Sequence, residues 1–301
     1  MIKPMLSGKI DFSKLVYPVF VSPKIDGIRC VIEHGRPMSR TAKELPNRHL
    51  RLCVQEAGNV LELLDGEIVV GPPSAPEVYN RTMSGIMSQT GVPNLRYLVF
   101  DHLGSQRSPY TLRLETLQKL KAVLPPWVEV LPQTLCQNQE EVEHWEEKYV
   151  SEGYEGIIVR SPSAQYKQGR STAKEGYLLK LKRYDDAEAI VIGFEELMRN
   201  ENEAFTDVQG HTKHTSHQAG QRAGGVLGAL VVNLMEGDGV STIRFKIGTG
   251  FDLAQRRALW VYRDKLPGKI VKFRYLPHGM LESTGVPRHP SFLGWRDPID
   301  L

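Results

Sequence analysis

Short runs of apolar and β-branched residues, separated by polar turn-forming residues, recur through the first 183 positions of the chain. Residues 17–32, YPVFVSPKIDGIRCVI, contain two such runs around a Pro-Lys-Ile-Asp-Gly break, which predicts a strand, a turn and a second strand. Residues 59–71, NVLELLDGEIVVG, repeat this pattern, with Asp65-Gly66 as the predicted turn. Three further runs predict strands: RYLVFDHL (96–103), EGIIVR (155–160) and YLLKLK (177–182).

Helical spacing of apolar residues occurs in two segments of the same region. These are TLRLETLQKLKAVL (111–124) and NQEEVEHWEEKYVSEG (138–153), the second ended by Gly153 as a C-cap. Strands joined by turns, with a few helices between them, predict an α+β domain of antiparallel sheets over residues 1–183.

The pattern changes after Arg183. Four strand-like runs follow, with an amphipathic helix over residues 252–266 between the third and fourth, and a fifth run lies near SFLGW. Five strands with a helix at this place predict an all-β OB-fold domain over residues 184–301. Residues 199–224 are polar and rich in helix and strand breakers, so they are expected to form a long mobile loop inside this domain.

Composition and charge exclude several classes of protein. Hydrophobic residues make up 41% of the 301 positions, enough for sizeable cores, and no run approaches the roughly 18 apolar residues of a membrane span. The N-terminal segment lacks the apolar region of a secretory signal. Three widely spaced cysteines, Cys30, Cys53 and Cys136, fit neither a disulfide framework nor a zinc site. We therefore expect a cytoplasmic protein with no membrane association, and a net charge of +3 permits a polyanionic partner.

Residues that can take part in catalysis or binding lie at the ends of the predicted strands or within them. Each has an ordinary structural explanation, since an Asp-Gly pair is commonly a turn, an aromatic is commonly in the core, and alternating lysines commonly form a solvated strand face. Their joint occurrence favours one shared cleft. The motifs, in chain order, are KIDGIR with Lys24, Asp26 and Arg29; SR with Arg40; LDGEIVV with Glu67; YLVFD with Phe100; EGIIVR with Glu155; and LLKLK with Lys180 and Lys182.

This ordered set resembles the covalent nucleotidyltransferase superfamily, which comprises ATP-dependent DNA ligases, RNA ligases and mRNA capping guanylyltransferases. The resemblance covers nearly the whole chain and is greatest to the minimal two-domain ATP-dependent DNA ligases of viruses and bacteria. The linking segment YKQGRSTAKEGYLLKLKRYDDAEAIVIG and the C-terminal RHPSFLGWRD carry it most specifically. It implies a nucleotidyltransferase (adenylation) domain followed by the OB-fold domain.

The activity implied is the sealing of 5′-phosphate/3′-hydroxyl nicks in duplex DNA, through a lysyl-AMP and an adenylylated DNA intermediate. The cofactors implied are ATP and Mg²⁺, with Mn²⁺ as a substitute, and the enzyme is expected to act as a monomer on nicked double-stranded DNA. An RNA ligase and a capping guanylyltransferase stay open as alternatives. A non-catalytic nucleic-acid-binding protein is disfavoured by the intact set of motifs.

By this resemblance Lys24 is the nucleophile that attacks the α-phosphorus of ATP. A lysine with an ordinary pKa of about 10.4 is neutral in only about one molecule in 10³ near pH 7.5, a handicap of about 4 kcal/mol. Nearby cations and partial burial lower that pKa, and Arg29, Lys180 and Lys182 are the candidates. Glu155 is the first candidate metal ligand.

The resemblance also assigns roles to the remaining cleft residues. Asp26 acts in the strand-joining step, Glu67 holds the ribose, and both are further candidate metal ligands. Phe100 stacks on the adenine. Ser22 stands where many ligases have a glutamate, so the preference for ATP over GTP rests on the similarity as a whole.

Arginine and lysine residues along the chain predict the contacts with DNA. Arg40 and Arg170 match the positions that hold the nick phosphate, which the planar fork of arginine suits. In KIVKFRYL, Lys272 and Arg274 share one strand face, either as a phosphate-tracking stripe or as ordinary solvated charges. The 199–224 segment is expected to clamp DNA through Arg199, Lys213 and Arg222.

Two motifs in the second domain need a choice between readings. The last motif of the superfamily is usually an Arg-x-Asp-Lys pattern in the OB domain. Arg263-Asp264-Lys265 lies on the predicted amphipathic helix, so we interpret this match as accidental. RHPSFLGWRD is the better candidate for the last motif. Its Arg288 and Arg296 are expected to orient the pyrophosphate of ATP. Three histidines at a spacing of three, His211, His214 and His217, have no cysteine or acidic residue near them and do not predict a zinc site.

Overall fold

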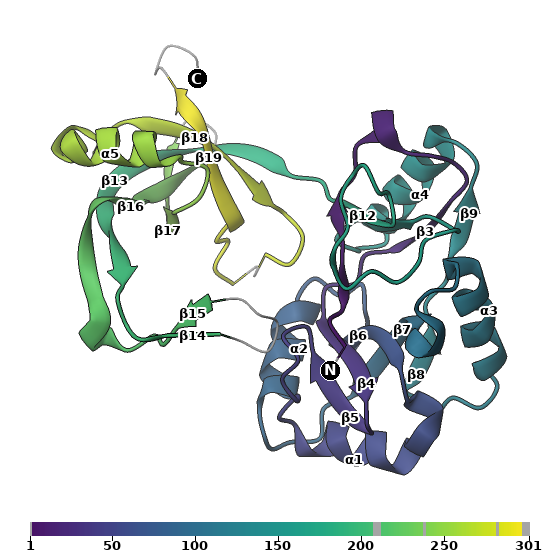
Figure 1. Ribbon diagram of the computed structural model, residues 1–301. Helices are drawn as coiled ribbons and strands as arrows, with labels where there is room; N and C mark the ends of the chain where they lie inside the picture. The colour runs from purple at the N-terminus through teal and green to yellow at the C-terminus, as the bar shows by residue number, and fades with distance from the viewer. Residues whose placement is uncertain (1, 207–211, 237–238, 281–282, 297–301) are drawn as a thin grey trace. The chain divides into compact units, whose positions relative to one another are not determined.

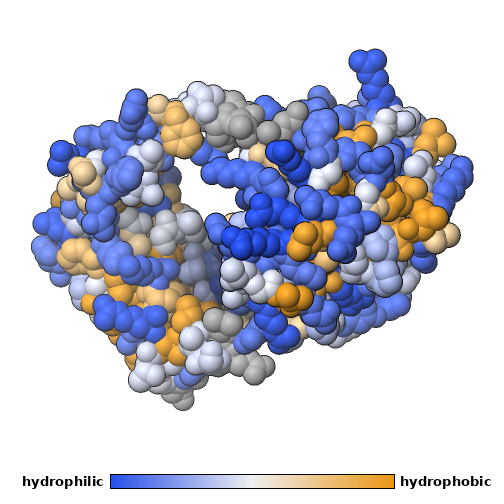
Figure 2. Space-filling model, turned by 90° about the horizontal axis from the view of Figure 1, so that it is seen from below, coloured by the Kyte–Doolittle hydropathy of each residue, from blue (hydrophilic) through white to orange (hydrophobic). Residues whose placement is uncertain are grey.

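A computed structural model describes residues 2–206, 212–236, 239–280 and 283–296 (Figure 1). The chain divides into two compact units, Met1–Arg183 and Tyr184–Leu301. No helix among the described residues is long and apolar enough to cross a membrane. Hydrophilic residues cover most of the face seen in Figure 2, with small hydrophobic patches between them.

The first unit is built on two five-stranded sheets with helices against them. The β3 sheet has the order β2 (Gly8–Lys9), β12 (Leu178–Leu181), β10 (Ile157–Arg160), β3 (Val19–Pro23) and β9 (Thr134–Cys136). The β4 sheet has the order β5 (Arg36–Ser39), β4 (Ile28–Glu33), β6 (Leu64–Val70), β7 (Leu95–His102) and β8 (Val128–Val130). The helices are α1 (Arg48–Ala57), α2 (Val78–Met87), α3 (Tyr110–Leu120) and α4 (Gln139–Ser151), with 3₁₀ turns η1 (Phe12–Lys14), η2 (Gly58–Leu61) and η3 (Leu103–Ser105).

The predicted α+β class is confirmed, and most strand pairs are antiparallel as expected. Three pairs are parallel instead, namely β2 with β12, β7 with β8, and the separate pair β1 (Met5–Leu6) with β11 (Gly169–Arg170). The two predicted helices are α3 and α4, and Gly153 follows α4 with a positive φ of 92°. A left-handed residue at this place is the expected end of a helix.

The predicted turn at Asp65-Gly66 is wrong. Both residues lie inside β6, where the pairing with β7 shifts by a β-bulge between them. A side chain at Gly66 would meet the carbonyl of Leu98 at 2.5 Å, so the glycine serves close strand packing. The run before it forms η2, not a strand.

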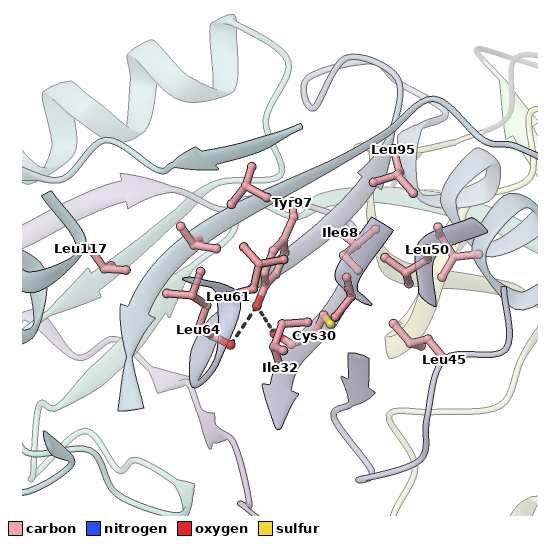
Figure 3. Close-up of a cluster of buried hydrophobic side chains, with 14 residues drawn as sticks. Cys30, Ile32, Leu45, Leu50, Leu61, Leu64, Ile68, Leu95, Tyr97 and Leu117 are labelled. Atoms are coloured by element: carbon pink, nitrogen blue, oxygen red, sulfur yellow. Dashed lines mark hydrogen bonds between the residues drawn. The ribbon is translucent and has the colours of Figure 1, made fainter. Parts of the chain in front are cut away.

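An apolar core packs the β4 sheet against helices of the first unit (Figure 3). Tyr97 is fully buried in this core, and its hydroxyl lies within hydrogen-bonding distance of the carbonyls of Cys30 (3.0 Å) and Leu64 (2.9 Å). These contacts satisfy the one polar atom of the ring, which would otherwise be costly to bury. The core thereby joins β4, β6 and β7, the strands that carry candidate site residues.

The expected five strands form one sheet among the described residues of the second unit, and the expected helix is present. The sheet has the order β17 (Gly239–Ile247), β16 (Gln221–Glu236), β13 (Asp185–Asn200), β18 (Ile270–Leu276) and β19 (Arg288–Arg296). Helix α5 (Leu253–Val261) begins with a capping box between Asp252 and Gln255. A bridge from Thr249 to Ser291 links the segment after β17 to β19, so the two edges of the sheet approach each other as in a barrel. The OB-fold class is confirmed.

The segment 199–224, predicted to be a long mobile loop, contains paired strands among its described residues. Strands β13 and β16 both continue into this segment and stay paired as far as Asn200 and Gln221. Between them lie the paired strands β14 (Ala204–Thr206) and β15 (Thr212–His214) and the turn η4 (Gln218–Gly220). We call residues 201–220 the hairpin extension. His211 lies outside the described residues.

Candidate active site

Lys24 lies where the chain passes from one sheet of the first unit to the other. Strand β3 ends at Pro23 in the β3 sheet, and β4 begins at Ile28 in the β4 sheet. The backbone N–H of Lys24 donates to the carbonyl of Gly156 at 2.8 Å, just before β10. Gly156 has a φ of 141°, and a side chain there would meet the carbonyl of Leu181 at 2.2 Å. Only glycine therefore allows this close approach of three backbone segments.

Glu155 joins the two lysines that the sequence places farthest apart. Its side chain is buried, and its two carboxylate oxygens form separate ion pairs with the ammonium groups of Lys24 and Lys182. Lys24 lies in the segment between β3 and β4, and Lys182 directly follows β12. The β3 sheet, which contains both β3 and β12, brings the two lysines to one carboxylate. One buried negative charge between two cations is an electrostatically satisfied arrangement.

Most of the predicted cleft residues line one cavity of about 260 Å³ within the first unit. Both sheets contribute to its wall, together with Leu131 and residues of the N-terminal segment. The sequence-predicted residues among its lining are Lys24, Arg29, Arg40, Glu67, Phe100, Arg170, Lys180 and Lys182. Asp26 and Glu155 are buried and are not part of the lining.

A second cavity, of about 270 Å³, adjoins the first and shares Arg29, Arg40 and Glu67 with it. Burial raises the pKa of Glu67 to about 7, although Arg29 and Lys24 act to lower it. Glu67 thus lies between both spaces as a carboxyl group that exchanges its proton near neutral pH.

Phe100 lies close to two buried ion pairs that sequence reasoning missed. The Arg29 guanidinium is 4.6 Å from the Phe100 ring centroid and is held by Asp65 through bonds of 2.5 and 2.6 Å. Arg160 is 5.7 Å from the same centroid and pairs with Asp101. Both carboxylates are fully buried.

A signal for these two aspartates was present in the sequence. Each lies within two positions of a motif residue, Asp65 two positions before Glu67 and Asp101 directly after Phe100. Tyr166 donates to Asp65 at 2.7 Å, and Arg113 reaches Asp101 at 2.7 Å. The aspartates therefore orient the cations around the aromatic ring.

Lys180 is surrounded by other positively charged side chains. Desolvation lowers its pKa first, and the charges of Lys24, Arg170, Arg40 and Lys9 lower it further. A site with this excess of positive charge suits phosphate groups.

The predicted DNA-contacting residues of the second unit already have partners within it. Lys272 pairs with Asp186 at 2.8 Å, and Arg274 stacks 5.5 Å from the ring of Tyr184. Val271 and Phe273 take the buried face of the strand, as its alternation predicted. The Lys272 and Arg274 pair thus lies on the outer face.

Arg288 and Arg296 stand at the two ends of β19. Arg288 donates to the carbonyl of His278 at 3.2 Å, and Arg296 pairs with Glu188 at 3.3 Å. The rejected tripeptide Arg263-Asp264-Lys265 forms the 3₁₀ turn η5 directly after α5. Arg263 donates there to the carbonyl of Trp260 and covers its ring.

Arg199 and Arg222 are cross-strand partners at the base of the hairpin extension. Like charges directly opposite each other weaken a sheet, so this pair is placed at a structural cost. Lys213 lies opposite Phe205 on β15. His214 contacts the carbonyl of Asn202, and the described residues contain no group of three His, Cys, Asp or Glu side chains that could hold a metal ion.

Comparisons with known proteins match both units. The family model "ATP dependent DNA ligase domain" matches residues 4–182, and the model "DNA ligase OB-like domain" matches residues 220–296. The chain belongs to the ATP-dependent DNA ligase family.

Similar solved structures cover nearly the whole chain of this family member. The Chlorella virus DNA ligase-adenylate is 30% identical, with 98% of this chain and 99% of that chain covered and a TM-score of 0.54. A structure from a study of Lig E DNA ligases is 25% identical, with 98% and 100% covered and a TM-score of 0.71. The DNA ligase of African swine fever virus is 23% identical over 164 residues. The chain matches only 34% of that curated relative's length.

Proposed function

We propose that this member of the ATP-dependent DNA ligase family seals nicks in duplex DNA, using ATP to form a lysyl-AMP on Lys24. The observation that carries the proposal is the position of Lys24, inside a cation-rich cavity and ion-paired to the buried Glu155. We further propose that the enzyme acts as a monomer in the cytoplasm, as its sequence predicts.

The first step joins Lys24 to AMP. The neutral amine attacks the α-phosphorus, a nitrogen–phosphorus bond forms, the bond to pyrophosphate breaks, and the amine nitrogen releases one proton to the solvent. Because the Glu155 carboxylate favours the protonated lysine, that ion pair has to open before attack. The cations around Lys180 then offset the charge that develops on the phosphate oxygens.

The nucleoside of ATP is assigned to the end of the cavity that holds Phe100. The Phe100 ring offers the adenine a stacking face, and Glu67 is placed to bind the ribose hydroxyls. Ser22 lies in the cavity wall on the β3 sheet, across from the β4 sheet that carries Phe100 and Glu67, with a hydroxyl that can donate or accept. It therefore gives no discrimination between adenine and guanine by itself.

The donor set fits a magnesium ion shared with the nucleotide. Mg²⁺ is usually held by one or two carboxylates together with substrate phosphates and water, so a cage of three protein ligands is not required. Glu155 would hold it, with Glu67 and Asp26 as further candidates, and Mn²⁺ would suit the same oxygen ligands. When bound, the ion neutralises phosphate charge.

The later steps transfer AMP to the 5′-phosphate of the nick and then join the strands with release of AMP. Arg40 and Arg170 line the cavity and are exposed, so they can bind the nick phosphate. Asp26 is assigned to the joining step. Contacts along the flanking duplex are assigned to the second unit, through Arg199, Lys213, Arg222, Lys272 and Arg274.

Nick sealing with a lysine variant tests the proposal. A labelled duplex with one 5′-phosphorylated nick is incubated with ATP and Mg²⁺, once as DNA and once as RNA, with wild type and with Lys24→Ala. Lys14→Ala is the matched control, because Lys14 is an exposed lysine whose ion pair among the described residues is with Asp11.

We expect DNA sealing by wild type and Lys14→Ala, and none by Lys24→Ala. Sealing of RNA alone would move the protein to the RNA ligases. Attachment of GMP in place of AMP, with no sealing, would identify a guanylyltransferase. Sealing that persists in Lys24→Ala would overturn the assignment of the nucleophile.

A further inference from the structure

Lys9 lies on the cavity face of the β3 sheet, in register with residues that line the cavity. Strand β2 pairs with β12 so that Lys9 is the partner of Lys180. Lys180 is the partner of Ile158, and Ile158 is the partner of Ser22. Because directly paired residues point to the same side of a sheet, these four side chains form one row across it.

The next row of residues along the same strands confirms that the row with Lys9 faces the cavity. Leu179, Val159 and Val21 are paired neighbours, and all three are buried in one apolar cluster on the opposite face. Ser22, Ile158 and Lys180 line the cavity. Lys9 therefore continues the cavity wall outward to the edge strand, where its side chain is exposed.

The positive charges along this edge are not neutralised by the part of the chain that the structure describes. Lys24 and Lys182 share Glu155, but neither Lys9 nor Lys180 has a carboxylate partner among the described residues. Like charges opposite each other on adjacent strands repel. Arg170 adds to the cluster, and its guanidinium donates to the carbonyl of Ser7 at 2.7 Å.

We propose that Lys9 binds a backbone phosphate of the nicked strand, next to the phosphate held in the cavity. This rests on the proposed function and extends it by one residue and one substrate contact. An unneutralised pair of lysines on adjacent strands is the arrangement expected where two successive anionic groups bind. Adjacent strands place the two side chains about 4.8 Å apart at their base, close enough for neighbouring phosphates of one backbone.

The location of Lys9 favours DNA over the triphosphate of ATP. Lys9 is not part of the cavity lining and lies on the outer strand of the sheet. A group at the rim meets a long polyanion that continues past the cavity, whereas the nucleotide is held inside. Each phosphate contact of a lysine also releases counterions, which makes the contact measurable through salt.

The experiment compares wild type with Lys9→Ala, Lys9→Arg and the control Lys14→Ala. Full-length protein is adenylylated beforehand, and its affinity for a nicked duplex with a 3′-dideoxy end is measured in EDTA at several salt concentrations. Neutralising one phosphate contributes about 0.9 to the slope of log Kobs against log salt. We expect Lys9→Ala to lower the slope by about that amount. Between about 50 and 200 mM salt, its affinity should then fall about 3.5-fold less than that of wild type.

Retention of the wild-type slope by Lys9→Arg and Lys14→Ala would support the assignment. A wild-type slope in Lys9→Ala would overturn it, and so would a higher KM for ATP in self-adenylylation of that variant. If wild type binds and seals only an RNA nick, the proposed DNA ligase activity fails, but the same comparison on RNA still tests Lys9. Absence of binding to either nick would overturn both.

Discussion

The side chain of Asp65 sets the orientation of the Arg29 side chain. Its carboxylate is fully buried, accepts two hydrogen bonds from the Arg29 guanidinium and a third from the Tyr166 hydroxyl. Burial alone would lower the pKa of Arg29, but the charge and hydrogen bonds of Asp65 raise it above its ordinary value. The guanidinium is thus held, fully charged, over the Phe100 ring.

Removal of this carboxylate should destabilise the first unit strongly. Asp65→Ala leaves Arg29 as an uncompensated buried charge, which typically costs about 3–5 kcal/mol in the free energy of unfolding. Urea unfolding followed by fluorescence measures the loss. Glu129→Ala is the matched control, because it breaks the half-exposed pair with Arg96 and should cost at most about 1 kcal/mol. Equal losses in both variants would contradict the role given to Asp65.

The Phe100 ring should contribute to nucleotide binding through its π face. Stacking of a base on an aromatic side chain is worth about 1–3 kcal/mol, so Phe100→Leu should raise the KM for ATP about 5- to 150-fold. Leucine keeps the apolar bulk but offers no ring, and Phe100→Tyr keeps the ring. Self-adenylylation at varied ATP concentration gives the KM. If Phe100→Leu has the KM of wild type, the adenine does not stack on this residue.

The long strands β13 and β16 extend the second unit beyond its barrel. Both strands run to 16 residues and pair as far as Asn200 with Gln221. Arg199 and Arg222 face each other at this base, and the exposed strands β14 and β15 follow. Such an exposed, locally paired extension carries little of the core and can be removed without exposing it.

Deletion of the hairpin extension should weaken nick binding without preventing self-adenylylation. Residues 201–220 are replaced by Asn-Gly, a two-residue turn that suits the paired ends at Asn200 and Gln221. With Lys213 removed, the slope of log Kobs against log salt should fall by about 0.9 or more. Arg199→Ala with Arg222→Ala in the intact chain separates the base of the extension from its tip. A deletion variant that cannot form lysyl-AMP would contradict this assignment.

The elements that sequence reasoning identified are those whose pattern is local. Alternation and helical spacing located β3, β4, β10, β12, α3 and α4, and most of the motif residues line one cavity, with Asp26 and Glu155 outside its lining. Asp65-Gly66 failed because a bulge inside a strand has the same two residues as a turn. Asp65, Asp101 and Arg160 were missed because their roles depend on partners 36 to 59 positions away. The passage from one sheet to the other at Lys24 likewise exists only in three dimensions.

The division of the whole molecule into two units assigns different steps to different residues. Lys24, Glu155 and Lys182 belong to the first unit, whereas Arg288 and Arg296 belong to the second. In the proposed reaction, pyrophosphate leaves only in the step that forms lysyl-AMP. A residue of the second unit that acts on pyrophosphate is therefore needed for that step and for no later one.

Arg296→Ala should slow self-adenylylation and spare the sealing of a nick that already carries AMP. The guanidinium would orient the leaving pyrophosphate, and loss of one such charge-assisted contact costs about 1.5–3 kcal/mol, or about 10- to 150-fold in rate. Glu188→Ala is the matched control, because it removes only the carboxylate that pairs with Arg296 at 3.3 Å. If Glu188→Ala reproduces the defect, Arg296 acts through its ion pair within the second unit. If both steps slow equally in Arg296→Ala, the arginine does not act on pyrophosphate.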